Sequence, residues 1–140
     1  LQKKNPLKKS PFFSLTLRKK LCRKLIKGHK KIQFNYYEDK LKSKTSIALV
    51  KFLKKRHKYK IFFIIGSDNL INFHKWKNYK ELLKLSILVV FSRKGFDTKA
   101  KKSVIMKNLK NKNIKFLKNL KIDISSTRLR SKIINGSKKN

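Results

Sequence analysis

The segment Ile61-Phe62-Phe63-Ile64-Ile65-Gly66-Ser67-Asp68 decides the fold that we predict for this chain. Its first five residues are all apolar, which predicts a parallel strand buried on both faces rather than the alternating pattern of a half-exposed strand. Gly66 at the carboxyl end of that strand lets a ligand approach the backbone, and Asp68 can accept hydrogen bonds from a ribose. The segment therefore indicates a nucleotide site at the end of a strand.

A second polar segment, far along the chain, complements the first. It is Ile124-Ser125-Ser126-Thr127-Arg128-Leu129-Arg130, which places hydroxyl side chains at the start of a helical pattern and two arginines in its first turn. Free N–H groups, hydroxyls and arginine at a helix N-terminus are typical of a phosphate site. From this motif alone, an ordinary serine N-cap on a terminal helix is an equally good interpretation.

Predicted helices and strands alternate along the chain. The apolar spacing and the capping residues predict helices over 14–26, 79–85 and 126–134, and another capped by Ser43 or Thr45 that runs to residue 55. They predict strands over 32–36, 61–65, 87–91 and 114–117, a loop or short helix over 69–76 and an ambiguous crossover over 99–112. This order predicts an α/β fold with a parallel sheet and right-handed crossovers. The length of 140 residues predicts a single domain over residues 1–140.

The composition is strongly basic, with 41 Lys and Arg against 6 Asp and Glu and a net charge of +35. Such a charge suggests a polyanion partner, but the lysines are spread over the whole chain, and we favour a general drift towards Lys. A basic, non-catalytic RNA-binding protein would need exposed aromatic rings interleaved with Lys. Tyr36, Tyr37, Tyr59 and Tyr79 are instead scattered. We therefore expect no specific nucleic-acid partner.

Several classes of protein and site are excluded or disfavoured. The single cysteine, Cys22, excludes an internal disulfide, and its position on an apolar helix face predicts a core residue. No apolar run approaches the ~20 residues that span a bilayer, so we expect no membrane partner and a cytoplasmic location. No His or Cys spacing suggests a metal site, and no carboxylate pair suggests acid–base catalysis. Asp97 is interpreted as structural.

Taken together, the motifs resemble those of nicotinate-nucleotide adenylyltransferase. The resemblance rests on five segments in the family's order: Asn5-Pro6-Leu7-Lys8, Ser43-Lys44-Thr45…Leu49, Gly66-Ser67-Asp68…Trp76, Ser92-Arg93-Lys94-Gly95 and Ile124 to Arg130. It covers roughly Asn5 to Gly136. Lys44 departs from the family's usual Tyr and Leu7 from its frequent His, so no role is carried over to either position.

The resemblance implies a Rossmann-like parallel sheet of the nucleotidyltransferase type, lacking its first strand and helix. It implies transfer of the adenylyl group of ATP, accompanied by Mg²⁺, to nicotinate mononucleotide, with deamido-NAD and pyrophosphate as products. The implied ATP contacts are Ser126, Thr127 and Arg130 on the phosphates and Gly66 and Asp68 on the ribose. The implied contacts of nicotinate mononucleotide are Trp76 stacked on the pyridine ring, the Thr45 hydroxyl and the Lys77 backbone N–H on the carboxylate, and Arg93 on the phosphate.

Other interpretations remain open for these residues and for the reaction. Without the resemblance, Trp76 would be interpreted as a packing residue, Asp68 as a helix N-cap and Arg93 as a solvated loop residue. A related adenylyltransferase could act instead on nicotinamide mononucleotide or on phosphopantetheine. The basic RNA-binding protein on the same scaffold is the alternative from another class.

One family motif is absent from these 140 residues, the Gly-x-Phe-Asp-x-x-His-x-Gly-His segment whose histidines hold the ATP phosphates. No catalytic residue is therefore assigned in this chain. Residue 1 is Leu and the only methionine is Met106, so we expect a fragment. The codons upstream of Leu1 should encode that motif, and the 140 residues alone should have little activity. Sequencing the coding DNA tests this expectation, and a start codon directly before Leu1 would contradict it.

Overall fold

The computed structural model describes residues 11–108 and 113–117. The chain divides into two units, Leu1–Lys44 and Thr45–Asn140, and each is described here by itself. The first unit contains helix α1 (Leu15–Ile26) and the short helix α2 (Glu38–Leu41). The second contains the sheet and every other described helix. A single domain over residues 1–140 stays a prediction.

Helix α1 begins and ends where the sequence predicts. The Oγ of Ser14 accepts a hydrogen bond from the Leu17 N–H at 3.2 Å, and Gly28 follows the helix with a φ of +89°. No α1 residue is buried, however, and Cys22 is only half-buried. The prediction that Cys22 is a core residue is therefore wrong for the described structure. Helix α1 instead contacts aromatic rings through its basic side chains: the Arg23 guanidinium lies over the Phe34 ring.

Residues 32–36 are irregular, so the predicted strand there is wrong. A strand needs a neighbour to pair with, and the sheet of the described residues holds only strands of the second unit. The segment is instead held by side chains. The Tyr36 hydroxyl donates to Asp39 at 3.3 Å, and the Lys19 Nζ lies 3.8 Å from the centre of the Tyr36 ring.

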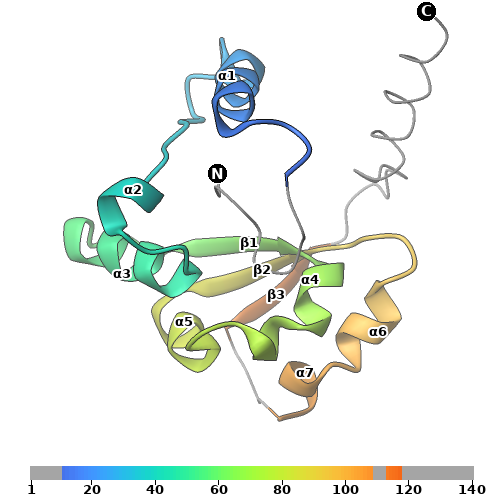
Figure 1. Cartoon of the computed structure of the whole chain (residues 1–140). Helices are drawn as coiled ribbons and strands as arrows, with labels where there is room; N and C mark the ends of the chain where they lie inside the picture. The colour runs from blue at the N-terminus through green and yellow to red at the C-terminus, as the bar shows by residue number, and fades with distance from the viewer. Residues whose placement is uncertain (1–10, 109–112, 118–140) are drawn as a thin grey trace, which may run out of the picture. The chain divides into compact units, whose positions relative to one another are not determined.

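The second unit is built on a parallel three-stranded sheet (Figure 1). Its strands, β1 (Phe62–Gly66), β2 (Ile87–Phe91) and β3 (Ile114–Leu117), lie in that order and are parallel throughout. Three of the predicted strands are thereby confirmed, with β3 at an edge as expected, and so is the α/β class. Because the strands are parallel, their carboxyl ends all lie along the same side of the sheet, across the strand direction.

Short helices connect the strands. They are α3 (Ser46–Arg56), α4 (Ser67–Ile71), the 3₁₀ helix η1 (Phe73–Lys75), α5 (Tyr79–Leu85), α6 (Asp97–Lys101) and α7 (Val104–Asn108). Helices α3 and α5 match their predictions, and the ambiguous crossover resolves into α6 and α7. The predicted helix over 126–134 lies outside the described residues. Over residues 11–108 and 113–117, no helix has the length and apolar character needed to cross a membrane.

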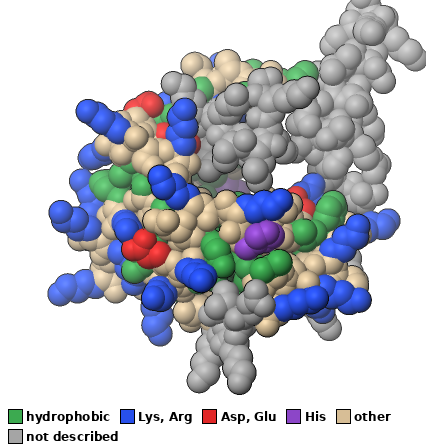
Figure 2. Space-filling view, turned by 60° about the horizontal axis from the view of Figure 1, so that its bottom comes forward, with side chains coloured by type: hydrophobic (Ala, Val, Ile, Leu, Met, Phe, Trp, Pro, Cys, Tyr) green, Lys and Arg blue, Asp and Glu red, His purple; other side chains and the backbone are tan. Residues whose placement is uncertain are grey.

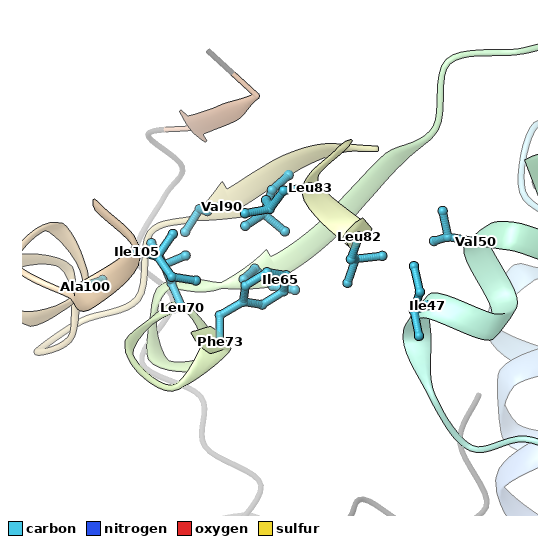
Figure 3. Packing of buried hydrophobic residues seen from close by; sticks show 11 residues of the cluster. Ile47, Val50, Ile65, Leu70, Phe73, Leu82, Leu83, Val90, Ala100 and Ile105 are labelled. Carbon is cyan, nitrogen blue, oxygen red and sulfur yellow. The ribbon is translucent and has the colours of Figure 1, made fainter. Parts of the chain in front are cut away.

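The apolar core lies on one face of the sheet (Figure 3). Side chains that alternate along each strand, such as Ile65 of β1 and Val90 of β2, pack against Leu70 and Phe73. Helix α3 packs against α5, and Figure 3 shows Ile47 beside Leu82. The buried cluster consists of Ile47, Val50, Ile65, Leu70, Phe73, Leu82, Leu83, Leu88, Val90, Ala100 and Ile105.

The opposite face of the sheet is exposed along β1 and at the ends of β2 and β3, whereas Val89 in the middle of β2 is buried. Phe62 and Ile64 are 54% and 64% exposed, and Phe91 and Leu117 are also exposed. The prediction that the first strand is buried on both faces is therefore wrong for these residues. The reason is the position of the helices. Helix α4 contacts β1 and α5 contacts β2, and both pack on the other face, where the apolar core lies.

Candidate functional site

The strand β1 ends in a turn where Gly66 leaves room for the side chain of Asp68. Helix α4 starts directly after Gly66, and the carboxylate of Asp68 in its first turn folds back over the strand end. A Cβ atom at position 66 would lie 2.5 Å from the Asp68 Oδ1 atom. The absence of a side chain at Gly66 therefore allows the carboxylate to take this position.

Arg93 follows β2 and meets Asp68 across the strand ends. Its Nη1 atom lies 2.6 Å from the Asp68 Oδ2 atom, a short charge-assisted hydrogen bond. The side chains of Asp68 and Arg93 are 25% and 40% exposed. The pair is therefore open to solvent on one side, where a ligand can reach both charges.

The backbone of Arg93 is held from two sides. Its N–H donates to the Oγ of Ser67 at 3.0 Å and to the Oδ1 of Asp97 at 2.9 Å. Ser67 is fully buried, and Asp97 is the first residue of α6. The turn after Arg93 closes with a hydrogen bond from the Phe96 N–H to the Arg93 carbonyl at 3.0 Å. Arg93 is thus positioned by its backbone as well as by its side chain.

Sequence reasoning missed Ser67 as a positioning residue and treated Asp97 as structural only. The signal for Asp97 was its place four residues after Arg93, at the start of a helix, where a carboxylate interacts favourably with backbone N–H groups. Ser67 had no such signal, because only the sheet pairing brings the residue after β1 beside the residues after β2.

The second oxygen of Asp68 has a different environment. Its Oδ1 atom is buried, and no hydrogen-bond donor of the described residues reaches it. A buried carboxylate oxygen without a donor is costly. One oxygen of Asp68 thus pairs with Arg93, and the other has no donor among the described residues.

Trp76 lies between η1 and α5 and combines packing with exposure. Its ring centre is 5.0 Å from that of Phe73 and 6.1 Å, edge to face, from that of Phe63. The side chain is half-buried and the following Lys77 is exposed. Asn78 then takes a left-handed conformation with φ of +52° and begins α5. Trp76 is thus packed against the covered face of the sheet, with part of its ring accessible.

Thr45 is the N-cap of α3, in an extended conformation. Helix α3 packs against α5, and an ion pair of 2.8 Å between Lys51 and Glu81 joins the two. The structure thus brings Asp68 and Arg93 into direct contact, while Thr45, Trp76 and Lys77 lie on α3 and on the segment before α5. The predicted phosphate ligands Ser126, Thr127 and Arg130 lie outside the described residues.

The described residues hold no group of three or more His, Cys, Asp or Glu side chains arranged to bind a metal ion. The chemistry of the site over these residues is instead that of a carboxylate, a guanidinium and an aromatic ring. Such a set can bind a hydroxyl, a phosphate and a planar ring.

Comparison with known proteins identifies relatives. A protein of Pelagibacter ubique named "Probable nicotinate-nucleotide adenylyltransferase" is 38% identical over 130 residues, which is 93% of this chain and 72% of that protein. Proteins of the same name from Fusobacterium nucleatum and Aquifex aeolicus are 41% and 32% identical, over 84% and 87% of this chain. The chain spans 61% of the first of these two and 76% of the second.

A family model agrees with these relatives. The model described as cytidylyltransferase-like matches residues 1–132, nearly the whole chain. The parallel sheet and the polar groups at its carboxyl ends are those expected for a nucleotide-binding fold of this kind. The chain therefore belongs to the cytidylyltransferase-like family of nucleotidyltransferases, where it is similar to nicotinate-nucleotide adenylyltransferases.

Proposed function

We propose that this protein transfers the adenylyl group of ATP to nicotinate mononucleotide, giving deamido-NAD and pyrophosphate. The observation that carries the proposal is the contact between Asp68 and Arg93 at the carboxyl ends of β1 and β2. It joins a hydroxyl acceptor and a phosphate ligand at the edge of the sheet where α/β folds bind nucleotides. The names of the relatives supply the identity of the two substrates.

The reaction requires positioning rather than a covalent intermediate. A phosphate oxygen of nicotinate mononucleotide attacks the α-phosphorus of ATP, the bond from that phosphorus to the bridging oxygen breaks, and pyrophosphate leaves with Mg²⁺. Arg93 binds the mononucleotide phosphate and lowers the repulsion between the two anions. Asp68 and Gly66 hold the ATP ribose. Ser126, Thr127 and Arg130 hold the ATP phosphates, because the free N–H groups at a helix N-terminus bind anions.

The mononucleotide extends from Arg93 at the strand ends towards the accessible part of the Trp76 ring. The Trp76 ring contacts Phe63, which precedes Gly66 by three residues, or about 10 Å along the strand. A pyridine ring, a ribose and a phosphate in series can cover that span. Trp76 then stacks on the pyridine ring, and the Thr45 hydroxyl and the Lys77 backbone N–H donate to its carboxylate.

The proposal includes three further points. Mg²⁺ enters with ATP as part of the substrate, since Mg²⁺ is commonly bound through nucleotide phosphates. Residues 1–140 belong to one catalytic domain, and the enzyme works in the cytoplasm, as the sequence predicts. Nicotinamide mononucleotide and phosphopantetheine are the competing acceptors, and both lack the carboxylate that the Thr45 and Lys77 donors would bind.

An assay of pyrophosphate release tests the reaction. The full natural gene product is supplied with ATP, Mg²⁺ and each of the three acceptors in parallel. We expect nicotinate mononucleotide to be preferred over the nicotinamide form by about five- to thirtyfold in kcat/KM, since a charged acceptor is worth roughly 1–2 kcal/mol more to the same donors. A preference for either other acceptor, or no release with any, contradicts the proposal.

Substitutions of the ion pair should affect the two substrates separately. Arg93→Gln should raise the KM for nicotinate mononucleotide by about tenfold or more, because a charge-assisted contact to phosphate is worth roughly 1.5–3 kcal/mol. Asp68→Asn should mainly raise the KM for ATP. Glu81→Gln is the matched control, since Glu81 forms the surface ion pair with Lys51. If both variants raise both KM values equally while melting like the wild type, the roles assigned to the pair are wrong.

Trp76 is the only tryptophan of the chain, so its fluorescence reports on one place. If its ring stacks on the pyridine ring, nicotinate mononucleotide should quench the emission saturably, and ATP alone should not. Trp76→Phe should keep most of the affinity because a ring remains, whereas Trp76→Leu should raise the KM for the mononucleotide strongly and leave that for ATP nearly unchanged. Normal kinetics of Trp76→Leu would show that Trp76 only packs against Phe73 and Phe63.

A further inference from the structure

A second charged surface lies at the other end of the sheet. The segment Lys54-Lys55-Arg56-His57-Lys58-Tyr59-Lys60 comprises the last residues of α3 and the loop that leads towards β1, and we call it the basic loop. It leads into the amino end of β1, whereas Asp68 and Arg93 lie at the carboxyl ends. Five residues of strand, roughly 16 Å, separate the two places. The basic loop is therefore not part of the site proposed for the reaction.

The basic loop combines its charges with two stacked rings, one of them strongly exposed. Figure 2 shows Lys and Arg side chains spread over the visible face, with few acidic ones between them. In the basic loop, the rings of His57 and Tyr59 stack in parallel, 5.1 Å apart and 11° from coplanar. Tyr59 is 71% exposed. A large ring so exposed gains little from the core and offers a flat surface to a ligand.

The structure also holds this ring in place. The Lys54 Nζ donates to the Tyr59 carbonyl at 3.2 Å, and the His57 N–H donates to the Leu53 carbonyl at 2.9 Å, which caps α3. Lys55, Lys58 and Lys60, which neighbour the two rings in the sequence, are exposed. The basic loop thus joins a held stacking surface to positive charges that are close in the sequence.

We propose that the basic loop binds single-stranded nucleic acid, with a base stacked on Tyr59 and the neighbouring phosphates on Lys55, Lys58 and Lys60. Base stacking on an aromatic ring together with backbone contacts to Lys is the usual way in which proteins hold single strands without reading their sequence. A lipid surface is the other polyanion to consider, because Phe62 and Ile64 are exposed just beyond the basic loop, and the vesicle arm of the experiment distinguishes it from a single strand. The binding is independent of the proposed reaction.

The experiment measures the anisotropy of a fluorescein-labelled 12-nucleotide uridine strand with the full natural gene product. The test variant Lys55→Gln/Lys58→Gln/Lys60→Gln has a matched control, Lys99→Gln/Lys101→Gln/Lys102→Gln, which removes the same charge from exposed lysines around α6. We expect the test variant to weaken binding and to lower the slope of log K against log salt by about 2, at roughly 0.7 for each phosphate contact. The control variant should change the slope much less.

The aromatic contribution is tested separately. Tyr59→Phe should bind like the wild type, and Tyr59→Leu should bind at least about fivefold more weakly, the lower end of the value of one stacked base. Inorganic polyphosphate, which has charge but no bases, should bind equally to both variants, and anionic lipid vesicles should show no dependence on Tyr59. Three outcomes would each overturn the proposal. The two lysine variants could weaken binding of the strand equally, Tyr59→Leu could keep the wild-type affinity, or the protein could fail to bind the strand at low salt.

Discussion

The arrangement of the site depends on Arg93, which is bound through its backbone and its side chain at once. Its N–H is shared by Ser67 and Asp97, and its guanidinium pairs with Asp68. These three partners come from the residues after β1 and from the start of α6, so one residue ties two strand ends and a helix together. Because the contacts are short and converge on one residue, moving any of the three elements displaces the positive charge at the sheet edge.

The apolar core explains why this edge can hold such a network. Leu70 and Phe73 are fully buried directly after Asp68, so the helix that carries the carboxylate is anchored by packing on the sheet. Charged side chains placed on well-packed elements lose little entropy when they bind a ligand. The buried residues that follow Asp68 in the sequence therefore fix the position of its carboxylate.

The sequence predicts the strands of the second unit and helix α1 of the first, but not the irregular segment 32–36. The runs 61–65 and 87–91 are continuous and apolar, and α5 has a strong helical spacing, so local pattern and tertiary packing agree there. Residues 32–36 have the composition of a strand but no pairing partner in the described structure, and propensity alone does not form a strand. The contact between Asp68 and Arg93 could not be predicted from spacing, because it depends on the register in which Gly66 lies beside Phe91.

The size of residue 66 controls the direction of a charge two residues away. A methyl group on Gly66 would meet the Asp68 Oδ1 atom at 2.5 Å, and the carboxylate, as the flexible partner, would be the group to swing aside. The backbone at this position has an ordinary φ of −83°, so alanine would be accepted by the chain itself. The glycine is therefore required by electrostatics and not by conformation: its single hydrogen atom acts as the spacer that keeps the carboxylate aimed at the guanidinium.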